Sequence, residues 1–263
     1  MKRVFWVLIS IAVLTSCNPE TNEPTDPIDP ISPPFVSCGD GFEFDSYVYA
    51  TVQIGGQCWF AENLRSAYYA NGDTIPTLLP NDEWYDAPEN NLGATTVYGD
   101  GNSQVNEGST DEAANLFYYG RLYNWPAVVD ARGLCPSGWH VPTDEEFMTL
   151  EMELGMSQEE ANSTGWRGSD QGTQMKASLD DFPSWDGTNT SGFKAIGAGY
   201  RGNGGFFASQ DVYTYFWTST AALTTPANET NALSRDLNVG DGRVVRGNMP
   251  HGMGLSVRCI QDE

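Results

Sequence analysis

Four of the five cysteines are candidates for disulfide bonds. The chain has 263 residues, with cysteines at positions 17, 38, 58, 135 and 259. If Cys17 is modified, an even number remains, which in an exported protein indicates disulfides. Four cysteines allow three pairings. We favour Cys38–Cys58, which closes a short loop, and Cys135–Cys259, which ties the middle of the domain to its last strand; four free buried thiols are the alternative.

Cys17 follows a segment typical of protein export. Lys2 and Arg3 precede an apolar run over 5–14, which is too short for a membrane span of about 20 residues but fits the apolar region of a secretory signal. The letters L-T-S-C at 14–17 resemble a lipobox, at which the cysteine thiol receives a diacylglycerol and the chain is cut before it. The resemblance implies a signal peptide over 1–16 and a membrane anchor of acyl chains such as palmitate on Cys17. A signal peptide without lipid is the alternative.

Residues 17–37 predict a flexible tether behind the lipid. The segment is rich in proline, acidic and almost free of bulky residues, so it cannot bury enough surface to fold. An acidic stretch soon after the lipidated cysteine resembles the surface-export signal of Bacteroidetes lipoproteins. We therefore expect a lipid-anchored protein of the outer membrane that faces outward, with its folded domain over 38–263.

The charge balance excludes two classes of partner. The formal charge is −22, and removing the leader with its two basic residues makes it more negative. Such a surface repels nucleic acid and anionic lipid headgroups, so we expect neither as a partner. Acidic clusters can hold Ca²⁺, but the sequence has no D-x-[DN]-x-[DN]-G loop.

The histidines and acids give no catalytic or metal-binding pattern. A zinc site needs three or four ligands at defined spacing, and His140 and His251 are the only histidines. We interpret His140, between Trp139 and Val141, as a packed, hydrogen-bonded core residue, and His251 as part of an exposed loop. The 35 acids offer no pair that spacing singles out for hydrolysis. We expect no catalytic residue, no metal and no cofactor.

Aromatic residues favour a binding function, because aromatic faces can stack on sugar rings. Trp84, Tyr85, Tyr213 and Tyr215 lie in or beside expected loops, so they are the candidate ligand-binding residues. The letters P-E-N at 88–90 match a calcium-lectin motif, but a tripeptide arises easily by chance. Five tryptophans are expected in the core because large aromatics dominate small-domain interiors: Trp59, Trp125, Trp139, Trp185 and Trp217.

Strands are expected on both sides of a long loop region. Residues 47–54 alternate as a strand, with one face formed by Val48, Ala50, Val52 and Ile54. Gly55-Gly56 is a turn signal before a second strand that begins at 57–60. Residues 71–115 are rich in Asn, Asp, Gly and Thr, so we expect long surface loops there, and the aromatic run over 116–129 should pack in the core.

The clearest local signal is a helix start. Thr143 is a good N-cap, and Glu146 completes a capping box. The helix should run from 144 to 155, with Phe147, Leu150 and Leu154 on one face. We also predict a short helix over 157–162, glycine-rich loops after it, and strands near 213–219, 234–239 and 256–260.

Several sequence blocks occur in an order that resembles the Fibrobacter succinogenes major paralogous domain family of secreted and surface lipoproteins. They are T-V-Q-I-G-G-Q-C-W-F-A-E-N-L (51–64), Y-Y-G-R-L-Y-N-W-P-A-V (118–128), L-C-P-S-G-W-H-V-P-T-D-E-E-F (134–147), G-F-K-A-I-G-A-G-Y-R (192–201), F-W-T-S-T (216–220) and L-S-V-R-C-I (255–260). The resemblance implies a single domain of unknown biochemical activity at the cell surface.

A more distant likeness predicts the fold. G-W-H-V-P-T-D-E-E-F is similar to the R-L-P-T-E-x-E-W helix of formylglycine-generating sulfatase-modifying enzymes, and V-V-R-G-N (244–248) and S-V-R-C (256–259) are similar to their closing strands. The likeness implies a C-type lectin-like fold: a loop-rich α+β domain with a small twisted antiparallel sheet and one or two helices. Those enzymes use paired reactive cysteines, whereas Cys259 has no neighbouring cysteine, so we do not expect their chemistry.

Together these features predict a surface-displayed binding or adhesion module without enzymatic activity, for a glycan or a protein partner. An enzyme that acts on cell-surface polysaccharide through carboxylates is one alternative. A structural component of a surface assembly is the other.

Overall fold

A computed structural model describes residues 37–101, 104–222 and 231–263 as a mixed α+β fold. The predicted signal peptide, the lipid site at Cys17 and nearly all of the tether lie outside the described residues. None of the helices in the described part is long and apolar enough to cross a bilayer.

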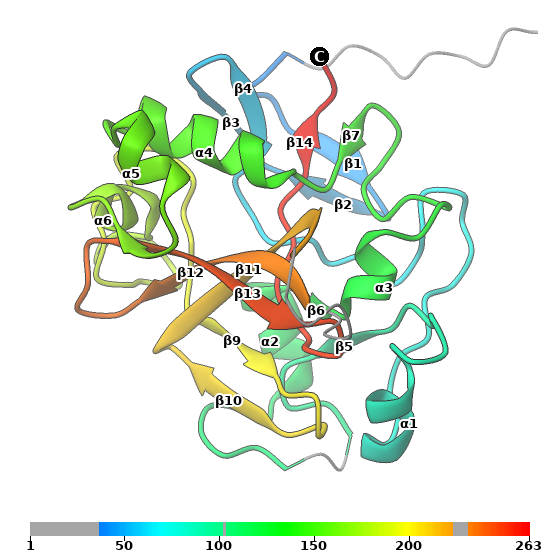
Figure 1. Ribbon diagram of the computed structural model, residues 1–263. Coiled ribbons are helices and arrows are strands. Elements are labelled where there is room, and N and C mark those ends of the chain that lie inside the picture. Colours follow the sequence, from blue (N-terminus) through cyan, green and yellow to red (C-terminus); the bar gives the residue numbers. More distant parts are fainter. Residues whose placement is uncertain (1–36, 102–103, 223–230) are drawn as a thin grey trace, which may run out of the picture. The chain divides into compact units, whose positions relative to one another are not determined.

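The larger sheet has six strands in the order β10-β9-β11-β12-β13-β8 and crosses the middle of the domain (Figure 1). Its neighbours pair antiparallel except β9 and β11, which are parallel. The strands are β8 (Gly165–Arg167), β9 (Ala198–Arg201), β10 (Phe207–Gln210), β11 (Tyr213–Ala221), β12 (Asn231–Asn238) and β13 (Val244–Pro250).

A second sheet of four strands lies at the top of Figure 1, in the order β3-β4-β14-β7. Two further pairs, β1–β2 and β5–β6, form separate ribbons. The bounds are β1 (Phe42–Phe44), β2 (Tyr47–Tyr49), β3 (Thr51–Ile54), β4 (Gln57–Phe60), β5 (Thr95–Val97), β6 (Arg121–Tyr123), β7 (Trp139–His140) and β14 (Ile260–Gln261).

Six short helices connect the strands of the described part. The predicted capping box is confirmed: Thr143 and Glu146 exchange both hydrogen bonds, and the helix ends two residues before the expected bound. A second capping box starts the predicted short helix at Ser157. The bounds are α1 (Asn81–Asp86), α2 (Glu112–Tyr119), α3 (Trp125–Val128), α4 (Asp144–Glu153), α5 (Gln158–Asn162) and α6 (Gln171–Met175).

The core has two main parts, one on each side of β4. One surrounds Phe60 and Trp139 and contains three of the cysteines. The other lies under α4, where Trp59, Phe147 and Phe193 pack together. Of the five tryptophans expected in the core, four are confirmed as buried, whereas Trp125 is half-buried.

Both favoured disulfides are formed. Cys38–Cys58 ties the start of the domain to β4, and Cys135–Cys259 ties the segment before β7 to the residue before β14. The two cross-links therefore fix both ends of the described chain to the four-stranded sheet.

The predicted strand over 47–54 is correct in its second half, where Ile54 is buried and Val52 packs against the same part of the core, and wrong in its first half. The chain breaks at Ala50 into β2, which pairs with β1, and β3, which pairs with β4. Val48 is exposed, whereas Tyr49 is buried and stacks on Phe60 with 4.6 Å between ring centroids. The break at Ala50 changes which side chains face the core, because a strand alternates only while it is continuous.

The expectation of surface loops over 71–115 is correct for much of the region, which is irregular and exposed, and wrong for the rest. This region contains α1, β5 and the start of α2, and residues 94–98 are buried. Polar side chains make the burial possible: the Asn124 amide oxygen accepts from the Ala94 N–H at 2.8 Å, and Thr95 donates to the Leu122 carbonyl at 3.0 Å. Two of the three strands predicted in the second half of the chain are confirmed: β11 covers 213–219, and β12 covers most of 234–239. In the third, predicted near 256–260, only Ile260 belongs to a strand.

A buried ion cluster joins α4 to the six-stranded sheet. Glu151 accepts from both terminal nitrogens of Arg167 (β8), at 2.7 and 2.8 Å, and from Arg235 Nε (β12) at 2.8 Å. At the start of α4, Asp144 pairs with Arg235 at 2.7 Å and with Arg246 (β13) at 2.5 Å. The guanidinium groups lower the pKa of Asp144 despite its burial.

We expect removal of the long-loop disulfide to cost more stability than removal of the short one. The cross-linked cysteines are 124 and 20 residues apart, which corresponds to about 5 and about 3 kcal/mol in the chain-entropy account. Urea unfolding of the two double variants, Cys135→Ala with Cys259→Ala and Cys38→Ala with Cys58→Ala, measures this. Equal losses would contradict the ranking.

We expect Glu151→Gln to lower the free energy of unfolding by about 3–5 kcal/mol, because it leaves two buried guanidinium groups without their shared carboxylate. Glu145→Gln is the matched control, since Glu145 is exposed on the same helix, and it should cost less than about 1 kcal/mol. Chemical denaturation of both variants measures the difference. A small effect of Glu151→Gln would show that the cluster is not a main source of stability.

Candidate functional site

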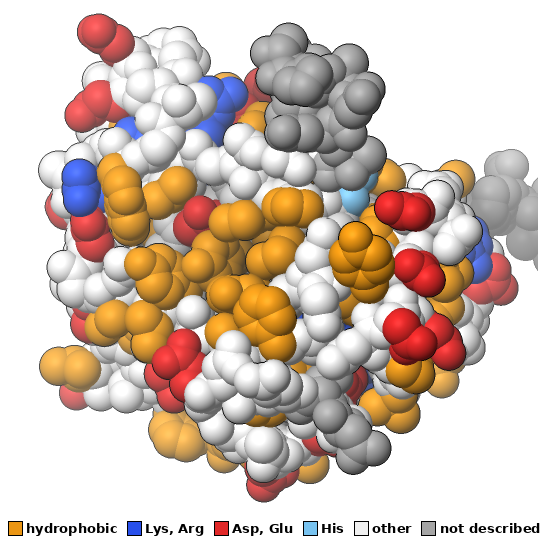
Figure 2. Space-filling model, turned by 60° about the horizontal axis from the view of Figure 1, so that its bottom comes forward, with side chains coloured by type: hydrophobic (Ala, Val, Ile, Leu, Met, Phe, Trp, Pro, Cys, Tyr) orange, Lys and Arg blue, Asp and Glu red, His pale blue; other side chains and the backbone are white. Residues whose placement is uncertain are grey.

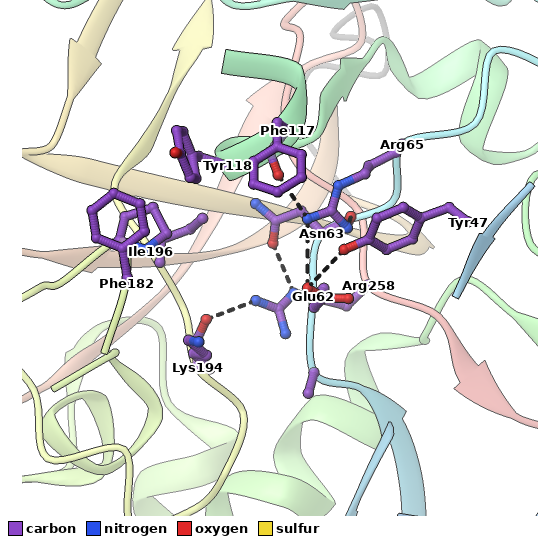
Figure 3. A pocket seen from close by; sticks show the side chains of 12 residues that line it. Tyr47, Glu62, Asn63, Arg65, Phe117, Tyr118, Phe182, Lys194, Ile196 and Arg258 are labelled. Carbon is purple, nitrogen blue, oxygen red and sulfur yellow. Dashed lines mark hydrogen bonds and ion pairs between the residues drawn. The ribbon is translucent and has the colours of Figure 1, made fainter. Parts of the chain in front are cut away.

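The best-formed candidate site is a pocket of about 220 Å³ beside the end of β4, which we call the aromatic pocket. Its walls come from β2, from the segment after β4, from α2, from the loop at 182–196 and from the segment before β14 (Figure 3). The lining residues are Tyr47, Ala61, Glu62, Asn63, Arg65, Phe117, Tyr118, Phe182, Pro183, Lys194, Ile196 and Arg258.

Three aromatic rings form one side of the aromatic pocket. Phe117 and Phe182 are 62% and 71% exposed, which is unusual for phenylalanine. Tyr118 lies between them, edge-on to both, with 4.9 Å between ring centroids in each pair. Their ring surfaces are therefore held in place by neighbours yet remain open to a ligand.

Three basic side chains line the rest of the aromatic pocket. Arg258 is 1% exposed and donates to Asn63 Oδ1 at 2.7 Å and to backbone carbonyls, and burial lowers the pKa of its guanidinium to about 9. The Arg65 guanidinium lies 4.1 Å from the centre of the Tyr47 ring. Lys194 pairs with Asp181 at 3.6 Å.

Glu62 is the one carboxylate among the lining residues. It accepts from the Tyr47 hydroxyl at 3.1 Å and lies 3.5 Å from Arg65 Nη2. Hydrolysis of a glycosidic bond generally uses two carboxylates that flank the bond. The geometry suits binding of a ring-sized polar ligand better than acid–base catalysis. No group of three or more His, Cys, Asp or Glu in the described part is arranged to hold a metal ion.

The structure contradicts one predicted ligand contact, that of Trp84. The indole is fully buried in α1, its Nε1 donates to the Gly252 carbonyl at 2.9 Å, and the Arg201 guanidinium lies 4.3 Å from its ring centre. No ring face is left for a sugar. Tyr85, the next residue, is exposed and lines a separate hollow of about 240 Å³ with Pro88 and Glu89, so its role stays a prediction.

Tyr213 and Tyr215 lie elsewhere, on β11. Both are half-buried, and their rings are nearly parallel at 15° with 5.7 Å between centroids, while Tyr200 meets Tyr215 edge-on. Figure 2 shows hydrophobic side chains gathered on the face that contains the lower strands of Figure 1. The two tyrosines line neither the aromatic pocket nor the hollow at Tyr85, and a ligand role for them stays a prediction.

The interpretation of His140 is correct in its hydrogen bonding and wrong in its burial. Its Nε2 lies 2.8 Å from Glu146 Oε1 and its Nδ1 lies 2.6 Å from Asp262 Oδ1, but the side chain is 39% exposed. The hydrogen bond to Glu146, with a further one to Asp262, raises the pKa of His140 to about 9. Two carboxylates on its ring nitrogens therefore favour the protonated form of the half-buried His140.

His251, expected in an exposed loop, is half-buried. Its ring stacks on Trp125 with 4.1 Å between centroids, and burial lowers its pKa. The expectation of exposure was wrong because His251 stacks on Trp125, and the composition of a loop does not predict such a contact with a distant segment.

Sequence reasoning missed the residues that form the aromatic pocket. Phe117 and Tyr118 were expected in the core as part of an aromatic run, and Phe182 lies in a short acidic segment without periodicity. One signal was present: Phe182 follows Asp180-Asp181 and precedes Pro183, and an apolar ring in such a polar turn is a candidate exposed contact.

Comparison with known proteins gives one match. The family model described as the Fibrobacter succinogenes major domain matches residues 52–261. Neither the curated proteins nor the solved structures contain a significant match. The likeness to C-type lectin-like proteins therefore stays a prediction, while the mixed α+β class is confirmed.

We expect His140 to make stability depend on pH above neutrality. A histidine in the unfolded chain has a pKa near 6.5. Because the folded pKa is higher, the stabilising contribution is complete below about pH 6.5 and is lost as pH rises through about 9. His140→Asn should remove this part of the decline in unfolding free energy.

Nuclear magnetic resonance of the imidazole measures the pKa directly. Asp262→Asn removes one partner without touching the capping box, so it should lower the pKa part of the way. Partial exposure keeps the stability effect below that of a buried pair. A pKa of His140 near 6.5 in the wild-type protein would contradict this account.

Proposed function

The chain belongs to the Fibrobacter succinogenes major domain family, and on that premise we propose that it is a binding or adhesion module without enzymatic activity, displayed at the surface of the outer membrane by lipid on Cys17. The observation that carries the binding function is the aromatic pocket, which is lined by the exposed rings of Phe117 and Phe182, by the buried guanidinium of Arg258 and by two partly buried cations, Arg65 and Lys194.

The size and lining of the pocket support a sugar ligand. Its volume of about 220 Å³ is below the roughly 300 Å³ at which drug-sized sites begin, so it fits one ring-sized group. Aromatic faces can cover the apolar face of a pyranose, while arginine and lysine side chains offer hydrogen bonds to its hydroxyls. The bound ring would be the terminal or a side-chain unit of a larger glycan.

The sequence supports the location. The L-T-S-C segment at 14–17 and the acidic, proline-rich residues that follow it resemble the lipid-attachment and surface-export signals of exported lipoproteins. Labelling of intact cells with a membrane-impermeant reagent tests the display, with Cys17→Ala as the variant that should lose membrane attachment.

A glycan array with the full-length protein in detergent tests the binding. For a glycan that binds, we expect Phe182→Ala to weaken binding about ten-fold, which is about 1.4 kcal/mol and typical of one aromatic contact. The melting temperature should not change, because Phe182 is mostly exposed. Leu179→Ala is the matched control, since Leu179 is an exposed apolar residue on the same loop that does not line the pocket.

If no glycan on the array binds, or if neither Phe182→Ala nor Leu179→Ala changes the binding, the aromatic pocket is not the ligand site. Release of a shorter sugar from a bound glycan would instead favour the enzyme alternative.

A further inference from the structure

We infer that the ligand of the aromatic pocket is an acidic glycan, with the carboxylate of a uronate ring held by Arg258, Arg65 and Lys194 and the ring itself against the exposed surfaces of Phe117 and Phe182. This inference rests on the proposed function and adds the chemical class of the ligand.

The first support is the local charge. The chain has 13 basic residues against 35 acids, yet three of the 13 line this one pocket together with a single carboxylate, that of Glu62. Even with Asp181, which pairs with Lys194 from outside the lining, the cations outnumber the carboxylates. A positive pocket in a strongly acidic protein favours an anionic ligand, which local contacts in the pocket would bind although the protein as a whole repels it.

The second support is the bonding of Arg258. Its guanidinium has five N–H groups, and four have acceptors in the described residues: Asn63 Oδ1 and the carbonyls of Phe60, Phe193 and Lys194. All four acceptors are neutral, and no carboxylate lies within ion-pair distance of Arg258 in the described part. One N–H of Nη2 has no acceptor there.

The ion cluster under α4 provides an internal comparison. Arg167 and Arg235 are buried like Arg258, but each is bonded to the carboxylate of Glu151. Burial of a cation without a counter-charge is costly, whereas a bound anion would compensate it. The fourth buried arginine, Arg201, donates to the carbonyls of Gly205 and Leu79 and stacks on Trp84, so burial alone does not distinguish Arg258. What distinguishes Arg258 is its place in the lining of the aromatic pocket, where a bound carboxylate would compensate its charge.

Arg65 is a second cation whose hydrogen-bonding capacity is only partly used, although its Nη2 lies 3.5 Å from Glu62 Oε1. Its side chain is 11% exposed, and its Nε is buried without a hydrogen-bond partner in the described residues. Its terminal nitrogens donate to the carbonyls of Asn63 and Phe117 at 3.5 and 3.1 Å. Figure 3 shows Arg65 and Arg258 on either side of Glu62 and Asn63, with Lys194 beyond Arg258.

The shape of the pocket favours a carboxylate on a ring over other anions. A carboxylate is planar and pairs well with guanidinium groups, and the exposed rings of Phe117 and Phe182 supply an apolar surface for the sugar. A highly charged polyanion would meet the repulsion of the whole chain, which carries −22. One carboxylate per sugar ring satisfies both conditions.

Matched pairs of ligands test the inference. Calorimetric titration of the full-length protein in detergent would use short oligomers of galacturonate, glucuronate and mannuronate, each with its methyl ester, and triglutamate as an acidic peptide. We expect at least one acid to bind ten-fold or more tightly than its ester and than triglutamate, and to weaken with added NaCl. The ester is the same size as the acid, so the difference reports the charge.

A matched pair of variants locates the effect. Lys194→Met should reduce the preference for the acid over its ester by about ten-fold. Arg243→Met removes the same charge from the chain at an exposed position outside the pocket, so it should leave the preference within two-fold of wild type. Unchanged melting temperatures would show that both variants are folded.

The inference is overturned if the esters bind as tightly as the acids, if triglutamate binds as tightly as the best acid, or if none of the three acids binds at millimolar concentration. Binding of a neutral glycan that depends on Phe182 would then leave the proposed function intact and remove only the acidic ligand. Loss of all glycan binding would remove both.

Discussion

The buried ion cluster beneath α4 is the constraint on which the arrangement of this domain depends. Glu151 and Asp144, one near each end of the helix, hold arginines from β8, β12 and β13, so the helix can lie over the six-stranded sheet in only one position. On its other side, the Gln57 amide of β4 donates to the Glu146 carbonyl. Helix α4 therefore sets the position of the two sheets relative to each other, and a buried charged cluster tolerates little displacement because each bond is directional.

Local signals in the sequence predicted the parts of the fold that depend on neighbouring residues. The capping box at Thr143 and the glycine turn at 55–56 were correct because a helix start and a hairpin turn are determined by a few consecutive residues. The break at Ala50 and the burial of residues 94–98 were not predictable in this way. They depend on the side chains of Phe60 and Asn124, which are distant in sequence.

The candidate site was less predictable than the fold, for a physical reason. Whether an aromatic residue is buried or exposed depends on which face of its element meets the rest of the chain, and Trp84 and Phe117 show the two errors this allows. Arg258 could be recognised in the block that ends at 260, but its lack of a carboxylate partner is visible only in three dimensions. A site built from five separate segments leaves no compact motif.

The short disulfide also has a mechanical consequence. Because Cys38 is bonded to Cys58, residues 39–57 form a closed covalent loop at the very start of the domain. Tension that enters from the N-terminal side bypasses β1, β2 and β3 and passes directly to β4, which continues into Glu62 and Arg65. Pulling therefore cannot peel the first three strands away one after another, and the load would reach the wall of the aromatic pocket through β4 instead.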